Sequence, residues 1–155
     1  MLKQELNMIK TFKQYNESVK DLLIGKSDED VKKGLDNLPN NKKIETIIKY
    51  QLDYSLLPRN SEGICTYYGH LDCSFNKLTS LPDNLTVNGH LYCYDNLLTS
   101  LPDNLIVNGF LNCRHNQLKK LPDNLIVKGD LYCGYNNQLP EGIKKPKGVK
   151  GNLYK

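Results

Sequence analysis

The sequence lacks long apolar runs, a secretory leader and a strong net charge. No stretch approaches about 18 uncharged apolar residues, which argues against a transmembrane helix. Glu5 and Lys10 fall where a secretory signal would carry its apolar core, so we expect a protein kept in the cytoplasm. The formal charge of +4 is modest, and the 21 basic and 17 acidic side chains are interspersed. This balance does not indicate a nucleic-acid-binding protein.

Catalytic and metal-binding patterns are also missing from the sequence. It contains no Ser-His-Asp arrangement, no glycine-rich phosphate loop and no paired CxxC spacing, so we expect neither an enzyme nor a cofactor. His70 and His90 occupy equivalent repeat positions near Asp72, and two imidazoles with a carboxylate are able to hold a transition metal. Phe110 and Asp130 continue that column without a third His, so we favour a solvated or partner-facing pair over a metal site.

What the sequence does contain is a repeat with a period of 20 residues. Three units begin at Leu71, Leu91 and Leu111 and read LDCSFNKLTSLPDNLTVNGH, LYCYDNLLTSLPDNLIVNGF and LNCRHNQLKKLPDNLIVKGD. A shortened unit follows from Leu131, and a degenerate forerunner precedes the first unit. One such unit cannot bury its own apolar face and must stack on its neighbours, so the period predicts a solenoid with atypical units at its ends.

Side-chain direction within a unit follows from the alternation of a strand. Leu91 and Cys93 point inward, while His90, Tyr92 and Tyr94 point outward. The return path is predicted to bring Leu98, Leu101 and Leu105 inward, and Gly109 to form a tight bend or a close approach.

Two polar residue types recur at inward positions. The stacked amides are predicted to form a hydrogen-bonded ladder inside the solenoid; they are Asn76, Asn96, Asn116 and Asn136. The thiols are predicted to be buried apolar filler rather than metal ligands or disulfides; they are Cys73, Cys93, Cys113 and Cys133, with Cys65 outside the period.

The pattern LxCxxNxLxxLPxxL, as in LYCYDNLLTSLPDNL, resembles the leucine-rich repeat, with Cys in place of the second strand Leu or Val. Its length and Leu-Pro pair resemble the short LPX repeats of bacterial type III secreted effectors, and are similar to small repeat proteins of bacteria and their phages. The resemblance covers roughly residues 56–155 and implies a solenoid with a parallel sheet. It departs where the family expects a Leu, at Asn88, Asn108 and Lys128.

The first 57 residues are predicted to be helical. Apolar residues from Leu2 to Leu23 recur at helical spacing, Ser27 with Asp30 forms a capping box for a second helix ending before Pro39, and Asn40 or Asn41 caps a third. The third helix is predicted to bury a stripe from Ile44 through Ile47, Ile48, Leu52 and Leu56. We therefore predict an α+β chain: a helical N-terminal cap at 1–57 and a leucine-rich repeat solenoid with a degenerate last repeat at 58–155. A bolder alternative makes the first helix a partner-binding or dimerising element.

The outward positions change from repeat to repeat and collect aromatics, Arg and His. Such side chains on a rigid sheet suit the anchoring of a partner, although Tyr also favours strands for its own sake. We expect a monomeric, non-enzymatic protein-binding module, and the resemblance implies a phage-encoded inhibitor or adaptor acting on a bacterial host or defence protein. The predicted partner-binding residues are His90, Tyr92, Tyr94, Asp95, Phe110, Arg114, His115, Tyr132 and Tyr135.

Two alternatives come from other classes. The tail from Lys144 to Lys155 carries five lysines and no acid, so nucleic-acid binding through this tail and the tyrosines is one. A small-ligand or glycan binder using the Tyr-rich sheet is the other.

Overall fold

A computed structural model describes residues 27–155. The chain divides into two compact units, residues 1–39 and residues 40–155, which are described separately. The helix predicted from Leu2 to Leu23 lies outside the described residues. Within 27–155, no helix is long and apolar enough to cross a membrane. The predicted domain boundary after residue 57 stays a prediction.

In the first unit, Ser27 caps the second helix as predicted, which confirms its side of the capping box. The hydroxyl of Ser27 accepts a hydrogen bond from the backbone N–H of Asp30 and donates one to the Asp30 carboxylate, at the start of α2 (Asp28–Asp36). The helix ends before Pro39, as expected for a residue that cannot continue it. Asn37 caps its C-terminus and donates its side-chain N–H to the carbonyl of Lys33.

The second unit opens with α3 (Asn40–Lys49), which packs against the first strand of the solenoid. Ile44, Ile47 and Ile48 are fully buried, so α3 shields the apolar interior that the first coil would otherwise expose. The Asn41 side chain donates to the backbone carbonyl of Tyr68 and accepts from its N–H. Asn41 therefore pairs with this backbone next to the first strand.

The third helix is shorter than the sequence predicts. It ends at Lys49, and Gln51 adopts a left-handed conformation with φ of 50°. The Asp53 carboxylate then accepts the N–H of Ser55 and starts a separate 3₁₀ turn, η1 (Tyr54–Leu56). The predicted stripe was therefore wrong at its end: Leu52 and Leu56 lie beyond α3 and are only half-buried. The Asp53 side chain bonds to the local backbone and starts a new turn, so the helix does not continue along the apolar periodicity.

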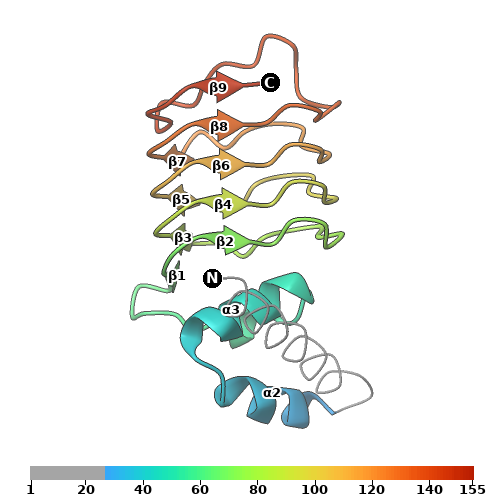
Figure 1. Ribbon diagram of the computed structural model, residues 1–155, viewed down its shortest axis with the longest axis vertical. Coiled ribbons are helices and arrows are strands. Elements are labelled where there is room, and N and C mark those ends of the chain that lie inside the picture. The colour runs from blue at the N-terminus through green and yellow to red at the C-terminus, as the bar shows by residue number, and fades with distance from the viewer. Residues whose placement is uncertain (1–26) are drawn as a thin grey trace, which may run out of the picture. The chain divides into compact units, whose positions relative to one another are not determined.

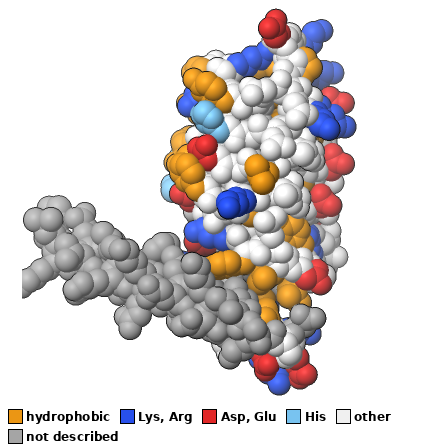
Figure 2. Space-filling model, turned by 90° about the vertical axis from the view of Figure 1, so that its right-hand side faces the viewer, with side chains coloured by type: hydrophobic (Ala, Val, Ile, Leu, Met, Phe, Trp, Pro, Cys, Tyr) orange, Lys and Arg blue, Asp and Glu red, His pale blue; other side chains and the backbone are white. Residues whose placement is uncertain are grey.

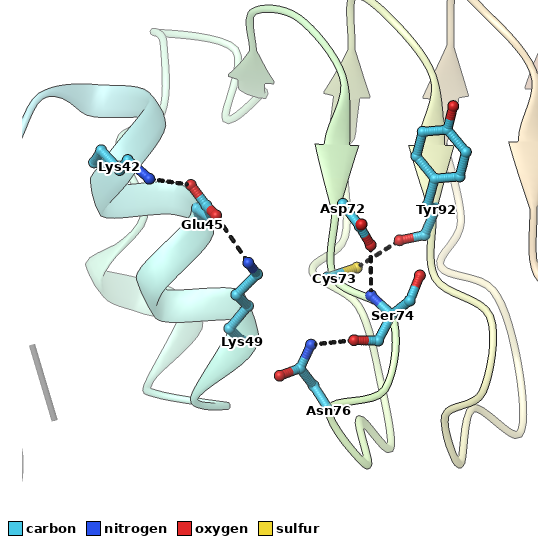
Figure 3. Close-up of polar contacts among 8 residues, drawn as sticks. All are labelled: Lys42, Glu45, Lys49, Asp72, Cys73, Ser74, Asn76 and Tyr92. Carbon is cyan, nitrogen blue, oxygen red and sulfur yellow. Dashed lines mark hydrogen bonds and ion pairs between the residues drawn. The ribbon is translucent and has the colours of Figure 1, made fainter. Parts of the chain in front are cut away.

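A small charged cluster lies on α3. Lys42 and Lys49 place their ammonium groups 3.0 and 2.9 Å from the Glu45 carboxylate (Figure 3). Burial raises the pKa of Glu45, but the hydrogen bonds and charges of the two lysines outweigh burial and hold the pKa below its ordinary value. Glu45 therefore stays ionised at neutral pH.

The solenoid consists of two parallel sheets whose strands stack like rungs (Figure 1). Sheet A contains β1 (Cys65–Tyr67), β3 (Leu85–Val87), β5 (Ile106–Val107) and β7 (Ile126–Val127). Sheet B contains β2 (Leu71–Asp72), β4 (Leu91–Tyr92), β6 (Leu111–Asn112), β8 (Leu131–Tyr132) and β9 (Leu153–Tyr154). Leu71 pairs with Leu91, and Leu91 with Leu111, so the sequence repeat is also the structural repeat.

Each of the first four coils has two strands, whereas the sequence predicts only the one in sheet B. Strands β5 and β7 of sheet A come from the NLIV segments, where Leu105 and Val107 point inward and Ile106 outward. A leucine-rich repeat typically combines one strand with a helical segment, so this coil departs from that pattern. Gly109 lies between the two strands, and a Cβ there would lie 2.8 Å from the carbonyl oxygen of Gly89, as the predicted close approach requires.

The interior contains the predicted amide ladder. The Asn116 carbonyl oxygen accepts the N–H of Leu98, and its amide N–H groups donate to the carbonyls of Cys93 and Cys113. Asn96 and Asn136 make the equivalent bonds one coil earlier and one coil later. Each amide therefore joins two successive coils. Asn76, in the first coil, is only half-buried and donates to Ser74.

The thiols occupy the interior as predicted. All five are free and buried. Those of Cys73 and Cys113 donate to the carbonyls of Tyr92 and Tyr132, at 3.4 Å in each case (Figure 3 shows the first). Burial raises the pKa of Cys73 to about 12, so its thiol stays protonated. Protonated, water-excluded thiols act as small apolar side chains.

Candidate protein-binding face

The outer surface of sheet B and the turns that follow its strands carry most of the exposed rings of the solenoid. We call this surface the aromatic face. Hydrophobic and His side chains gather along one edge of the solenoid in Figure 2, among a few acidic ones. The rings of the aromatic face belong to His70, Phe75, His90, Tyr92, Tyr94, Phe110, His115, Tyr132, Tyr135 and Tyr154.

One row of rings precedes the strands of sheet B. The rings of His70 and His90 stack with centroids 4.3 Å apart, and those of His90 and Phe110 with centroids 3.8 Å apart. Each imidazole also accepts a backbone hydrogen bond at Nδ1: His70 from the N–H of His90, and His90 from the N–H of Phe110. These bonds require an unprotonated Nδ1, so the neutral rings carry their proton on Nε2.

This geometry does not suit the two-imidazole metal site. The rings lie parallel, and their Nδ1 atoms are engaged by backbone N–H groups. Across residues 27–155, no three His, Cys, Asp or Glu side chains cluster in a way that could hold a metal ion.

A second row lies on the strands themselves. Phe110 makes edge contacts with Tyr92 and Tyr132. The ring of Tyr132 stacks on that of Tyr154, with centroids 4.8 Å apart. The Arg114 guanidinium lies 4.8 Å from the centre of the Tyr132 ring. Desolvation and the nearby Asp130 carboxylate raise the pKa of Tyr132, so its hydroxyl remains a donor. The row therefore combines apolar ring surface with polar edges, as binding anchors do.

A third row stands on the turns after sheet B. Phe75 meets Tyr94 edge-on at 5.0 Å, and His115 stacks on Tyr135 at 4.3 Å. The backbone at Phe75, His115 and Tyr135 is left-handed, with φ between 51° and 58°. This conformation favours Gly, Asn or Asp, and at bulky residues it costs about 1 kcal/mol. Phe75 and Tyr135 are nevertheless 69% and 71% exposed, so burial does not compensate for that cost.

All nine predicted site residues lie on this face, from His90 to Tyr135. Asp95 occupies the left-handed turn position of the second repeat, a conformation that Asp adopts more readily than bulky residues do. The predicted set of partner-binding residues left out three rings of this face: His70, Phe75 and Tyr154. Tyr154 was missed because the last coil is longer, so that Leu131 pairs with Leu153 and Tyr132 with Tyr154. The phrase KGNLY, similar to KGDLY at residues 128–132, was the available signal.

The stacked rings of His70 and His90 make the stability of the fold depend on pH. Desolvation, followed by the charge of His70, lowers the pKa of His90 below its ordinary value of 6.5. The unfolded chain therefore binds a proton at His90 more readily than the folded chain does. The stability that neutral His90 contributes is complete above about pH 6.5 and is lost as the pH falls through the lowered pKa of His90. We expect the urea concentration at the unfolding midpoint to decrease when the pH is lowered from 7.5 to 5.5. The variant His90→Phe, which copies Phe110, should lose part of that change, and an equal change in both proteins would contradict the assignment to His90.

The chain matches no protein-family model, and comparisons with curated proteins and with solved structures gave no match either. A function is therefore inferred from the geometry of the aromatic face.

Proposed function

We propose that this protein is a non-enzymatic binding module that holds a protein partner on the aromatic face. The observation that carries the proposal is the continuity of the rings: contacts link His70 through His90 and Phe110 to Tyr132 and Tyr154, from the first strand of sheet B to the last. Rings and Arg on a rigid surface lose little conformational entropy on binding, which is why they dominate interface hot spots.

The left-handed turns support the same proposal. Rings at Phe75, His115 and Tyr135 impose a backbone cost that an Asn or Gly would avoid. Their exposure means that packing inside the chain does not account for them. A binding role does, because a ring held away from the chain can enter a pocket on a partner.

The finer predictions rest on the resemblance of the repeat motif alone. We propose on that basis a leucine-rich repeat relative that acts in the cytoplasm as an inhibitor or adaptor, of phage origin, against a bacterial host or defence protein. Nucleic-acid binding through the tail remains the alternative, but Lys145 and Lys155 there donate to backbone carbonyls of the C-terminal segment.

The test compares two triple variants in a pull-down from the source cell. The face variant carries Tyr94→Ala, Arg114→Ala and Tyr135→Asn. The control variant carries Thr86→Ala, Ile106→Ala and Ile126→Ala, which truncate outward side chains of sheet A. We expect the control to retain the captured protein and the face variant to lose at least nine-tenths of it, while both keep the far-ultraviolet spectrum of the wild type.

Other results would overturn the proposal. Equal capture by the face variant would show that the rings do not bind the partner. Capture of nucleic acid that disappears with the tail, or a thermal shift with glycans but no captured protein, would favour the alternatives.

A further inference from the structure

A groove lies at the C-terminal end of the solenoid, outside the aromatic face. It encloses about 790 Å³ between the LKKLP segment of the third repeat and the segment from Pro140 to Lys147. Figure 2 shows Lys and Arg side chains gathered toward this end of the solenoid. The basic residues that line the groove are Lys119, Lys120, Lys144, Lys145 and Lys147.

Carboxylates within residues 27–155 do not balance the five positive charges of the groove, and the Lys145 ammonium donates to the uncharged carbonyl of Gly151. Asp123 is the one acidic residue in its lining. No ion pair joins any of the five lysines to a carboxylate within residues 27–155. Like charges held together repel one another, so this arrangement opposes folding. An anionic occupant would remove that repulsion.

The repeats show that the coil does not need two of these lysines. Lys119 and Lys120 stand where the first two units have Thr79 with Ser80 and Thr99 with Ser100. The same turn therefore forms with neutral residues. The two charges appear only in the repeat that faces the C-terminal lysines across the groove.

The rest of the lining indicates the class of anion. Between the lysines lie aliphatic and proline side chains, Leu121, Pro140, Ile143 and Pro146. The groove has no aromatic ring on which a base could stack and no Arg for bidentate phosphate binding. Lysines around an aliphatic floor complement carboxylates alternating with aliphatic side chains, which favours an acidic peptide over a nucleic acid.

We propose that this groove binds an acidic, aliphatic segment of a protein, rich in Asp or Glu and Leu or Ile. The inference deepens the proposed function, since it gives the protein partner a second contact outside the aromatic face. Its test uses a synthetic peptide, so it can fail while binding at the aromatic face stands.

The experiment measures fluorescence anisotropy of a dye-labelled 12-residue peptide of Glu and Leu with the full-length protein. The groove variant is Lys119→Thr with Lys120→Ser, which copies the first two repeats and should keep the wild-type unfolding curve. A charge-matched variant adds Asn88→Lys and Asn108→Lys, because Lys128 occupies this position in the third repeat. It restores the net charge at another place.

We expect the wild type to bind the peptide with an affinity that falls as salt rises. The groove variant should bind about tenfold more weakly, and the charge-matched variant should not recover. Face substitutions should leave this affinity unchanged. Recovery in the charge-matched variant, equal binding of a Gln and Leu peptide, or tighter binding of an oligothymidylate would each overturn the proposal.

Discussion

Replacing Asn116 with Ala is expected to lower the free energy of unfolding by about 2–4 kcal/mol. The side chain is 7% exposed and holds the N–H of Leu98 and the carbonyls of Cys93 and Cys113. Truncation leaves the N–H of Leu98 buried without a partner, which costs about 1–3 kcal/mol. It also removes one of the two amide donors from each carbonyl, since Asn96 still donates to Cys93 and Asn136 to Cys113. Chemical denaturation followed by circular dichroism measures the loss.

Asn88→Ala is the matched control for this substitution. Asn88 is exposed, and its side chain accepts one hydrogen bond, from the Asn108 amide. We expect a change within about 0.5 kcal/mol. Asn116→Asp should be as harmful as Asn116→Ala near neutral pH, because it removes the donors and buries a charge. A loss below about 1 kcal/mol for Asn116→Ala would contradict the view that the amides join the coils.

Leu111→Ala is expected to cost about 3 kcal/mol, within the range of about 2–5 kcal/mol for buried leucines. Leu111 is fully buried in the central strand of sheet B, between Leu91 and Leu131 in register. Its loss opens a cavity that both neighbouring coils line, and a coil rests on its neighbours for stability. The measurement is the unfolding midpoint in urea.

The control is Leu97→Ala, which removes the same side chain from a position that is 42% exposed. We expect a cost below about 1 kcal/mol there. Equal costs at the two positions would mean that the sheet B leucines are not packed between coils.

The repeat period predicted the inward columns correctly because one constraint acts on every coil. A residue such as Leu111 or Cys113 recurs in phase only if each coil stacks on the last, so the period fixes which side chains are buried. The buried Asn116 amide was predictable for the same reason, since a polar side chain in that column must bond to backbone groups.

Other features of the fold depend on contacts that cannot be predicted from the 20-residue period or from helical spacing. Sheet A was missed because its residues, such as Leu105, were assigned to the return path, and strands such as Ile106–Val107 form only when coils pair. The end of α3 depended on the left-handed Gln51 and on the Asp53 side chain. Tyr154 lay beyond a longer last coil.

The candidate site was predicted in part. Six of the nine residues share outward positions that alternation in a strand reveals, so their common face was predictable; they are His90, Tyr92, Tyr94, Phe110, Arg114 and Tyr132. The stacking of His70 on His90 and the left-handed turns at Phe75 and Tyr135 were not, because they depend on backbone conformation. The groove formed with Lys119 was missed for another reason: its two sides meet only in the folded chain.

Thiol accessibility tests most directly whether stacked coils shelter the inward columns. Cys73, Cys93 and Cys113 are buried, and burial raises the pKa of each thiol, to about 12 for Cys73. Because disulfide reagents react with the thiolate, the folded protein at pH 8 should leave these three cysteines unlabelled, as peptide mapping by mass spectrometry will show. All three should react in guanidinium chloride. Labelling of the folded protein at the rate of a free thiol would contradict the stacked-coil account.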